Sequence, residues 1–293
     1  MKTLSIIILS LIPLFAFTQK SSLIFQNAEI ERQGTEFSFT EGATTAPDGR
    51  VFFTDQPNDR IYIWCENEGV SLWLEGTERA NGMYFTNGQL FACADENNRI
   101  VVFDEDKNMT IIHEKYDNIH LNGPNDLWVA PNGNIYFTDP YYHRPWWAEE
   151  HREAQPYRGV YFLCTRGEVQ RVINDFEMPN GIVGTPDGKT LYVADIKAGK
   201  TWKYDILPNG NLTNKTFFAP HGSDGMTIDE HGNVYLTIMR KVWIYSPEGI
   251  LLKEIEFPEA PSSIAFGGKE RNILFVTART SVYTLKMNVK GVN

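Results

Sequence analysis

A hairpin pattern recurs six times along this chain, and the repeat limits what the chain can fold into more than any other feature. Its clearest copy is residues 122–142, where the polar pair Asn125-Asp126 precedes a short apolar run. A Pro-Asn-Gly turn at 131–133 follows, and a second apolar run then ends at Asp139. Proline and glycine favour turns, whereas Trp, Val, Ile, Tyr and Phe favour strands, so the segment predicts a β-hairpin.

Each copy begins with a polar residue that we call its anchor. The anchors are Glu41, Asn81, Asn125, Asn180, Asp224 and Ser262, spaced 38 to 55 residues apart. Two further strand-like runs follow the hairpin in most copies, so each unit holds four strands. Units of this size and content predict an all-β six-bladed β-propeller, with four-stranded antiparallel blades around a central channel.

The two ends of the chain complete this prediction. The sixth unit lacks a fourth run, and we expect residues 22–30 to supply it, which would close the ring and remove exposed strand edges. Residues 1–19 carry Lys2 and then an apolar run from Leu4 to Phe17, too short and too poorly flanked to span a membrane. They predict a secretory signal peptide ahead of a single propeller domain, residues 20–293, that is secreted or periplasmic.

Composition excludes some partners and cofactors. The formal net charge is −10, which argues against nucleic acid and anionic membranes. The charge suits a protein that binds cations, although a solvated acidic surface is the commoner reason for it. Three cysteines without paired spacing give neither a disulfide framework nor a zinc knuckle.

The anchors should converge, because residues just before the inner strands of a propeller meet at one mouth of its channel. All six carry oxygen in their side chains and two are acids. Hard cations such as calcium prefer oxygen ligands, whereas the absence of histidine and cysteine disfavours zinc and copper. Turn formation explains any single anchor more simply. The fixed phase of the whole set favours a metal site.

Four short motifs, in order and at blade spacing, carry a family resemblance. They are Glu41-Gly42, Pro124-Asn125-Asp126, Pro179-Asn180-Gly181 and Ser223-Asp224-Gly225-Met226. Across residues 36–285 the chain resembles the gluconolactonase and regucalcin (senescence marker protein) family, especially its secreted bacterial members. It is more distantly similar to diisopropylfluorophosphatase and the paraoxonases.

The resemblance implies a catalytic divalent ion and a small-molecule lactone or ester substrate. By this resemblance Glu41, Asn125, Asn180 and Asp224 hold the ion, which is Ca2+, with Mg2+, Mn2+ or Zn2+ as alternatives. The regucalcin branch has an arginine where this chain has Gly123, and its acidic substrate contact falls near His143. Sugar-acid specificity therefore does not carry over.

Substrate contacts are expected around the mouth. Residues 139–158 form the longest insertion, and long loops at a propeller mouth often form substrate walls. Packing of the aromatic side chains of this insertion against a neighbouring blade is the competing interpretation. The predicted substrate contacts are Asn81, His120, Tyr141, His143 and Trp146.

The leading hypothesis is a metal-dependent lactonase in which Asp224, or water that it holds, acts as general base. No Gly-x-Ser-x-Gly sequence is present, which argues against a serine hydrolase. Hydrolysis of phosphotriesters on the same metal is an alternative within the same class. A non-catalytic propeller that binds a protein or glycan is the alternative from another class, and it would not need acids at the mouth.

Overall fold

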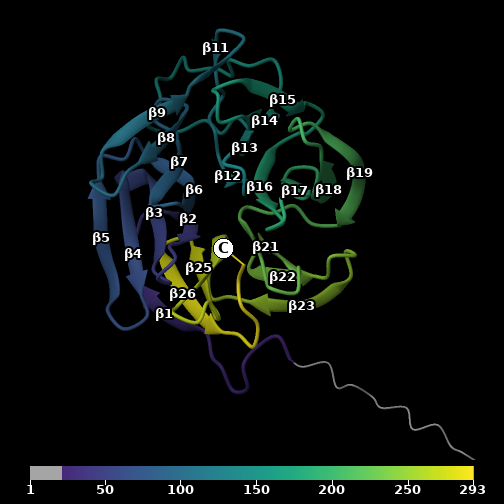
Figure 1. Cartoon of the computed structure of the whole chain (residues 1–293). Helices are drawn as coiled ribbons and strands as arrows, with labels where there is room; N and C mark the ends of the chain where they lie inside the picture. Colours follow the sequence, from purple (N-terminus) through teal and green to yellow (C-terminus); the bar gives the residue numbers. More distant parts are fainter. Residues whose placement is uncertain (1–21, 293) are drawn as a thin grey trace, which may run out of the picture.

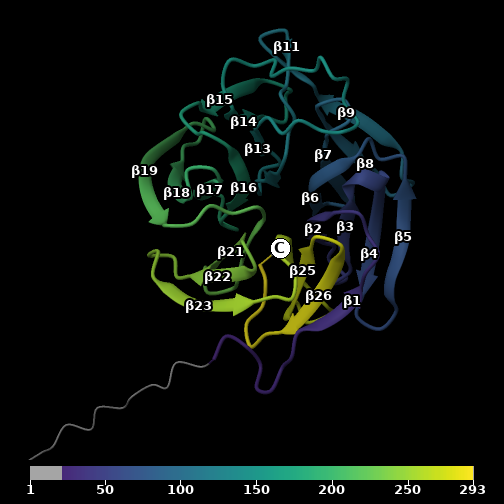
Figure 2. The ribbon, with the colours of Figure 1, turned by 180° about the vertical axis from the view of Figure 1, so that it is seen from behind.

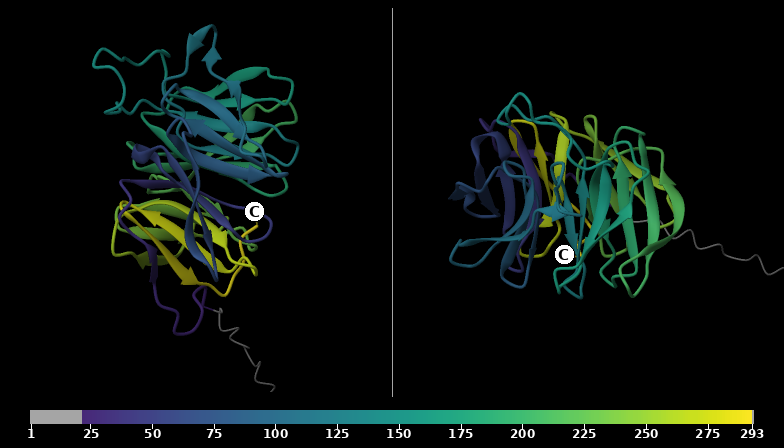
Figure 3. Two further views of the ribbon diagram at one scale, coloured as in Figure 1. Left: turned by 90° about the vertical axis from the view of Figure 1, so that its left-hand side faces the viewer. Right: turned by 90° about the horizontal axis from the view of Figure 1, so that it is seen from above.

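Residues 22–292 are described by a computed structural model of the chain. Six four-stranded antiparallel sheets stand around a central axis (Figure 1), which confirms the six-bladed propeller. Figure 2 shows the same ring from behind. Seen from the side, in the right panel of Figure 3, the strands run between the two faces of the ring. The expected signal peptide, residues 1–19, lies outside the described residues and stays a prediction.

Each blade has four strands, which follow one another from the innermost to the outermost. Blades 1 and 2 are β2(Thr40–Thr45), β3(Val51–Asp55), β4(Arg60–Cys65), β5(Gly69–Glu75) and β6(Ala80–Thr86), β7(Gln89–Ala94), β8(Arg99–Phe103), β9(Met109–His113). Blades 3 and 4 are β12(Leu127–Val129), β13(Ile135–Asp139), β14(Gly159–Leu163), β15(Val169–Ile173) and β16(Pro179–Gly184), β17(Thr190–Asp195), β18(Lys200–Ile206), β19(Leu212–Ala219). Blades 5 and 6 are β20(Met226–Ile228), β21(Val234–Ile238), β22(Lys241–Tyr245), β23(Leu251–Glu256) and β24(Pro261–Gly267), β25(Ile273–Ala278), β26(Ser281–Lys286), β1(Glu31–Gly34).

Burial explains why the inner strands read as unbroken apolar runs. Every residue of β13 is buried because neighbouring blades cover both faces of the sheet, whereas β9 at the rim is mostly exposed. Glycine makes the tight turn of each inner hairpin. Gly133, for example, has φ 83°, a left-handed conformation, and its N–H donates to Ala130 O at 2.8 Å.

The two faces of the ring have different connections. The inner strands begin on one face, which we call the anchor face, and turn back on the other, which we call the turn face. Two small elements lie outside the blades, a 3₁₀ turn, η1(Gln56–Asn58), and the hairpin β10(Lys115–Tyr116) with β11(Ile119–His120). In residues 22–292 no helix is long and apolar enough to cross a bilayer.

Closure of the ring follows the expected principle but not the expected residues. The fourth strand of blade 6 does come from the N-terminal side, and β1 pairs antiparallel with β26. That strand is Glu31–Gly34, so its placement at residues 22–30 was wrong. The apolar side chains that indicated a strand pack instead against the core of blade 6, and Ile24 makes only an isolated bridge to Met287.

Candidate active site

Glycines bring the anchors close together at the anchor face. Gly42 has φ 61°, and a Cβ there would lie 2.0 Å from the carbonyl oxygen of Asn81. A Cβ on Gly82 would lie 2.5 Å from Asn125 O. Gly181 and Gly225 approach Asp224 and Ser262 in the same way. The repeated anchor-glycine pair of the sequence is therefore a packing requirement, because each glycine admits the backbone of the next anchor.

Asn180 sits between two acceptors. Its Nδ2 donates to Asp224 Oδ1 at 2.8 Å and to the Tyr142 hydroxyl oxygen at 3.0 Å. A carboxylate only accepts hydrogen bonds, so the amide nitrogen must face Asp224. The amide oxygen of Asn180 is consequently buried without a partner, and the amide oxygen of Asn81 is buried without a partner as well. Buried polar atoms of this kind call for an explanation, such as an ion.

The carboxylates at the mouth resist ionisation. Burial, and then the charges of Asp224 and Asp126, raise the pKa of Glu41 well above its usual range. Burial also raises the pKa of Asp224 and brings that of Asp126 to about 7. Neighbouring negative charges disfavour one another, and a divalent cation between them would remove that cost.

The available donors fit a hard cation. In residues 22–292 no cluster of three or more His, Cys, Asp or Glu side chains is placed to hold a metal. Glu41 and Asp224 are instead combined with the amide oxygens of asparagine, and such a mixture of oxygens suits calcium. The residues present therefore fit a calcium ion better than a zinc ion.

Asp126 forms a second polar layer just inside the channel. It follows Asn125, where four other anchors are followed by glycine. Its carboxylate accepts the backbone N–H groups of Leu127 at 2.9 Å and Ile182 at 3.3 Å. Its role at the site was missed by sequence reasoning, although the break in the anchor-glycine pattern could have revealed it.

The insertion contributes two residues that the sequence did not single out. Tyr142 contacts Asn180, and the charge of Arg144 lowers the pKa of both Glu41 and Asp224, so both side chains reach the mouth. The register of β12 with β13, Leu127 opposite Phe137, brings the start of the loop next to the anchor of blade 3. That register could have predicted that the insertion starts beside the mouth. The insertion contains no repeat, so its sequence does not show which of its side chains point toward the anchors.

Some predicted substrate contacts lie beside the anchors and others do not. Asn81 is at the mouth. Trp146 lies one layer behind it, with the guanidinium groups of Arg79 and Arg144 over its ring at 4.7 and 5.8 Å. Tyr141 packs inside its own loop, where its hydroxyl donates to the carbonyl oxygen of His151 at 2.9 Å.

The two predicted histidines are not brought to the anchors. His143 is exposed and its ring lies against Trp147, 6.4 Å between centroids. His120 is exposed on β11, which lies at the outer edge of the ring (Figure 1). Trp147 also closes the space over Gly123, where a Cβ would lie 3.1 Å from its ring.

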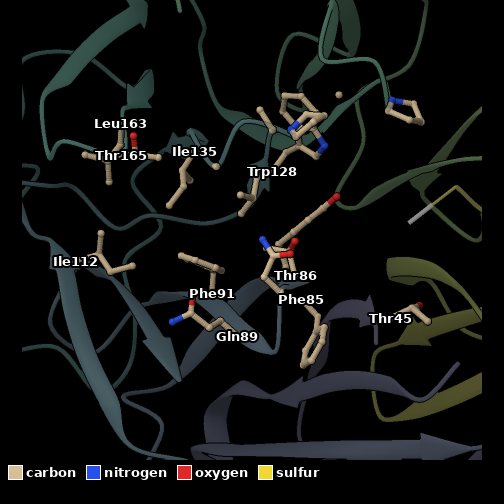
Figure 4. A pocket seen from close by; sticks show the side chains of 18 of the residues that line it. Thr45, Phe85, Thr86, Gln89, Phe91, Ile112, Trp128, Ile135, Leu163 and Thr165 are labelled. Carbon is tan, nitrogen blue, oxygen red and sulfur yellow. The ribbon is translucent and has the colours of Figure 1, made fainter. Parts of the chain in front are cut away.

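Cavity volume does not identify the site. Asp224 lines a cavity of about 230 Å³ on the anchor face, together with Phe39, Met239 and Arg279. A larger cavity of about 700 Å³ lies on the turn face, mainly between blades 2 and 3 (Figure 4). It holds none of the anchors, so the candidate active site is the smaller cavity and the adjoining mouth.

The fold and this constellation define a propeller of the lactonase-like hydrolase class. The family described as SMP-30/gluconolactonase/LRE-like region matches residues 39–280. The chain belongs to this family.

Similar proteins agree with that assignment. The gluconolactonase of Zymomonas mobilis is 26% identical over 292 residues, covering 89% of this chain and 82% of that protein. The structure of XC5397 from Xanthomonas campestris, described as a gluconolactonase, superposes with a TM-score of 0.84 at 25% identity, covering 90% and 91% of the two chains. The diisopropyl-fluorophosphatase of Loligo vulgaris is 28% identical over 253 residues, covering 79% of this chain and 77% of that protein.

Proposed function

We propose that this protein is a calcium-dependent hydrolase of lactones or related esters. The observation that carries the proposal is the buried amide oxygen of Asn180, which has no partner and lies beside the carboxylate of Asp224. The raised pKa of Glu41 adds to it, because a cation would stabilise the ionised carboxylates. Membership of the family and the two relatives described as gluconolactonases support a lactone as substrate.

Glu41, Asn125, Asn180 and Asp224 would hold the ion. When bound, the ion supplies Lewis-acid polarisation of the substrate carbonyl. Asp224 accepts a proton from water as the water oxygen attacks the carbonyl carbon, and returns a proton to the alkoxide that leaves. Asn180 orients the Asp224 carboxylate through its Nδ2, and the Tyr142 hydroxyl holds the same amide from the other side. A carboxylate held in place in this way can serve as a general base.

The direct test removes the metal and restores it. Protein treated with a chelator is assayed for lactone hydrolysis, and its melting temperature is measured with Ca2+, Mg2+, Mn2+ or Zn2+ added. Calcium should restore hydrolysis and raise the melting temperature, because an ion bound only to the folded state stabilises it. A protein that contains no metal by elemental analysis, and stays inert with an unchanged melting temperature, would instead be a non-catalytic module that binds a protein or glycan.

Phosphotriester hydrolysis is the second candidate function. The similarity to the diisopropyl-fluorophosphatase of Loligo vulgaris over 79% of this chain favours it. The same calcium-loaded protein should be assayed with a p-nitrophenyl dialkyl phosphate and with a lactone. We expect a higher kcat/KM on the lactone, and the reverse order would exchange the two candidates.

The proposal includes export from the cytoplasm. The apolar run between Leu4 and Phe17 motivates it. Mass spectrometry of the protein recovered from cell-envelope and medium fractions should find a mature N-terminus near residue 20. Recovery of the intact N-terminus in the cytoplasmic fraction would contradict export.

A further inference from the structure

Arg144 is fixed in place by a buried carboxylate from another blade. Its Nε lies 2.5 Å from Asp95 Oδ2, and the Asp95 side chain is only 1% exposed. The same carboxylate also accepts a hydrogen bond from Gln56 Nε2 at 2.7 Å. A guanidinium held in this way has lost most of its rotational freedom before any ligand arrives.

Asp95 has different hydrogen-bond partners from the equivalent aspartates of other blades. In three other blades, the aspartate that ends the second strand accepts two backbone N–H groups from the segment leading into the inner strand of its own blade. These aspartates are Asp55, Asp139 and Asp195. In blade 2 the equivalent aspartate binds the insertion of blade 3 instead, so position 95 serves Arg144 rather than its own blade.

Aromatic rings complete the support of the guanidinium. It lies over the rings of Tyr142 at 5.3 Å and Trp146 at 5.8 Å. Trp147 fastens the loop to blade 2, because its Nε1 donates to Asp95 O at 2.8 Å. Stacking and the ion pair together fix the plane of the guanidinium.

The supported guanidinium faces the anchors without bonding to them. It lies over the ring of Tyr142, whose hydroxyl accepts a hydrogen bond from the anchor Asn180 at 3.0 Å, yet it forms no ion pair with Glu41 or Asp224. Within residues 22–292, Asp95 is the ion-pair partner found for Arg144, so most of its five N–H donors remain available. The Arg144 side chain is 19% exposed, so a ligand that carries oxygen atoms can reach these remaining donors.

We propose that Arg144, positioned by Asp95, is a substrate-recognition residue that donates hydrogen bonds to an oxygen substituent near the scissile carbonyl. In this chain, discrimination between an oxygen-substituted lactone and an alkyl lactone therefore depends on Arg144, since an alkyl substituent offers nothing to a guanidinium donor. This inference rests on the proposed lactone hydrolysis and names the chemical group that the site selects.

The test compares two lactones of the same ring size, glucono-1,5-lactone and δ-valerolactone, with calcium saturating. Arg144→Met should lower kcat/KM on the hydroxylated lactone about 10- to 100-fold, as expected for a lost charge-assisted hydrogen bond, and on δ-valerolactone less than about 3-fold. Arg144→Lys should recover part of the loss. Asp95→Asn should raise KM more than it lowers kcat, on the hydroxylated lactone only.

Two controls separate recognition from structural damage. Arg79→Met removes the other guanidinium stacked on Trp146, which donates to Pro57 O rather than facing the anchors, and should leave both lactones unaffected. In Arg144→Met the rise in melting temperature caused by calcium should be equal or larger, because a positive charge beside the carboxylates has been removed. An equal loss on both lactones, or a weakened calcium response, would overturn the proposal.

A binding measurement keeps the inference separate from the proposed function. If the wild type hydrolyses neither lactone, lactone hydrolysis is wrong, but recognition is still measured by titrating calcium-loaded protein with gluconate and with 5-hydroxypentanoate in a calorimeter. The wild type should bind gluconate more tightly, and Arg144→Met should abolish the difference. The proposed role of Arg144 would be wrong if the wild type bound the two acids equally or bound neither. It would also be wrong if the difference in affinity persisted in Arg144→Met.

Discussion

The two ends of the central channel are built by the same inner strands, but of the two cavities only the one at the anchor end is lined by a carboxylate. At the anchor end, carboxylates and amide oxygens lie beside a cavity of about 230 Å³. At the turn end, the cavity of about 700 Å³ is lined by aromatic side chains that include Tyr84, Phe91 and Trp128. The phase of the repeat decides which end of the channel receives the anchors, and cavity volume does not follow it. The smaller cavity is the one beside which we propose the cation and the general base.

The largest effect on lactone hydrolysis is expected from Asp224→Asn at the anchor end. The variant keeps the size of the side chain and an oxygen ligand but cannot accept a proton at neutral pH. Lactone hydrolysis should fall by about 10² to 10⁴ even at saturating calcium, as expected for the loss of a general base. The measurement is turnover as a function of calcium concentration.

Asn180→Ala is the matched variant for that experiment. It removes a proposed metal ligand, the amide of Asn180, which neither gains nor loses a proton at neutral pH. High calcium should therefore restore part of its activity. Near wild-type turnover of Asp224→Asn at saturating calcium would show that Asp224 is a ligand only. Glu41 would then be the next candidate for the base.

The insertion that covers the anchor end can be broken at Trp147. This side chain is buried, stacks on His151 at 4.1 Å and bonds to Asp95. Trp147→Ala should cost about 3 to 5 kcal/mol of unfolding free energy, measured by denaturant titration, as for other buried aromatics. Trp146→Ala is the comparison and should cost less, because Trp146 is only partly buried. Unchanged stability with altered substrate preference in Trp147→Ala would identify it as a wall of the substrate site.

The pH dependence of stability should come from the anchor end as well. Burial raises the pKa of Glu41 and Asp224, and that of Asp126 to about 7, so the folded protein keeps protons that the unfolded chain has lost above about pH 4. The free energy of unfolding of metal-free protein should therefore fall as the pH rises from about 4 to about 7.

Melting curves at pH 5 and pH 8 provide the measurement. Metal-free protein should melt at a higher temperature at pH 5, by about 2 °C for each kcal/mol involved. Calcium should stabilise more at pH 8, because it binds the ionised carboxylates. Glu41→Gln should reduce the dependence on pH. Greater stability of metal-free protein at pH 8 would contradict the raised pKa values of these buried carboxylates.

The smallest expected effect belongs to the turn end. Arg271 lines the large cavity, and its Nη1 is buried without a partner, so this end also contains an unsatisfied polar atom. Arg271→Gln should change kcat/KM for a lactone by less than about 2-fold, as for substitutions away from a functional site. A loss comparable to that of Asp224→Asn would mean that the two ends act together.

Much of the architecture could be predicted because the same hairpin pattern occurs six times, so that each copy supports the interpretation of the others. The blades, their order and the convergence of Glu41, Asn180 and Asp224 follow from periodicity, which averages out local irregularity. His120 shows the limit of reading along the chain. It lies two residues before Asn122, but left-handed turns at Asp117 and Asn118 carry it onto an outlying hairpin.

A contact that is made in one blade only does not appear as a periodic pattern in the sequence. Arg144 turns inward because Asp95, from the preceding blade, is free to bind it, and neither residue indicates this alone. The placement of β1 failed for a related reason. Leu23, Ile24 and Ile30 are apolar because they pack on blade 6, and packing and pairing select similar residues.

The join between β1 and β26 has a consequence for the order of folding. Each of blades 1 to 5 is made of neighbouring hairpins, which can form as soon as their own residues are available. Blade 6 must unite positions 251 residues apart, such as Gln33 and Thr284. The entropic cost of closing a loop rises by about 0.6 kcal/mol for each doubling of its length, so this pairing should form last and limit the folding rate. Joining the two ends and reopening the chain at the exposed turn near Gly69 would move the slow step from blade 6 to blade 1.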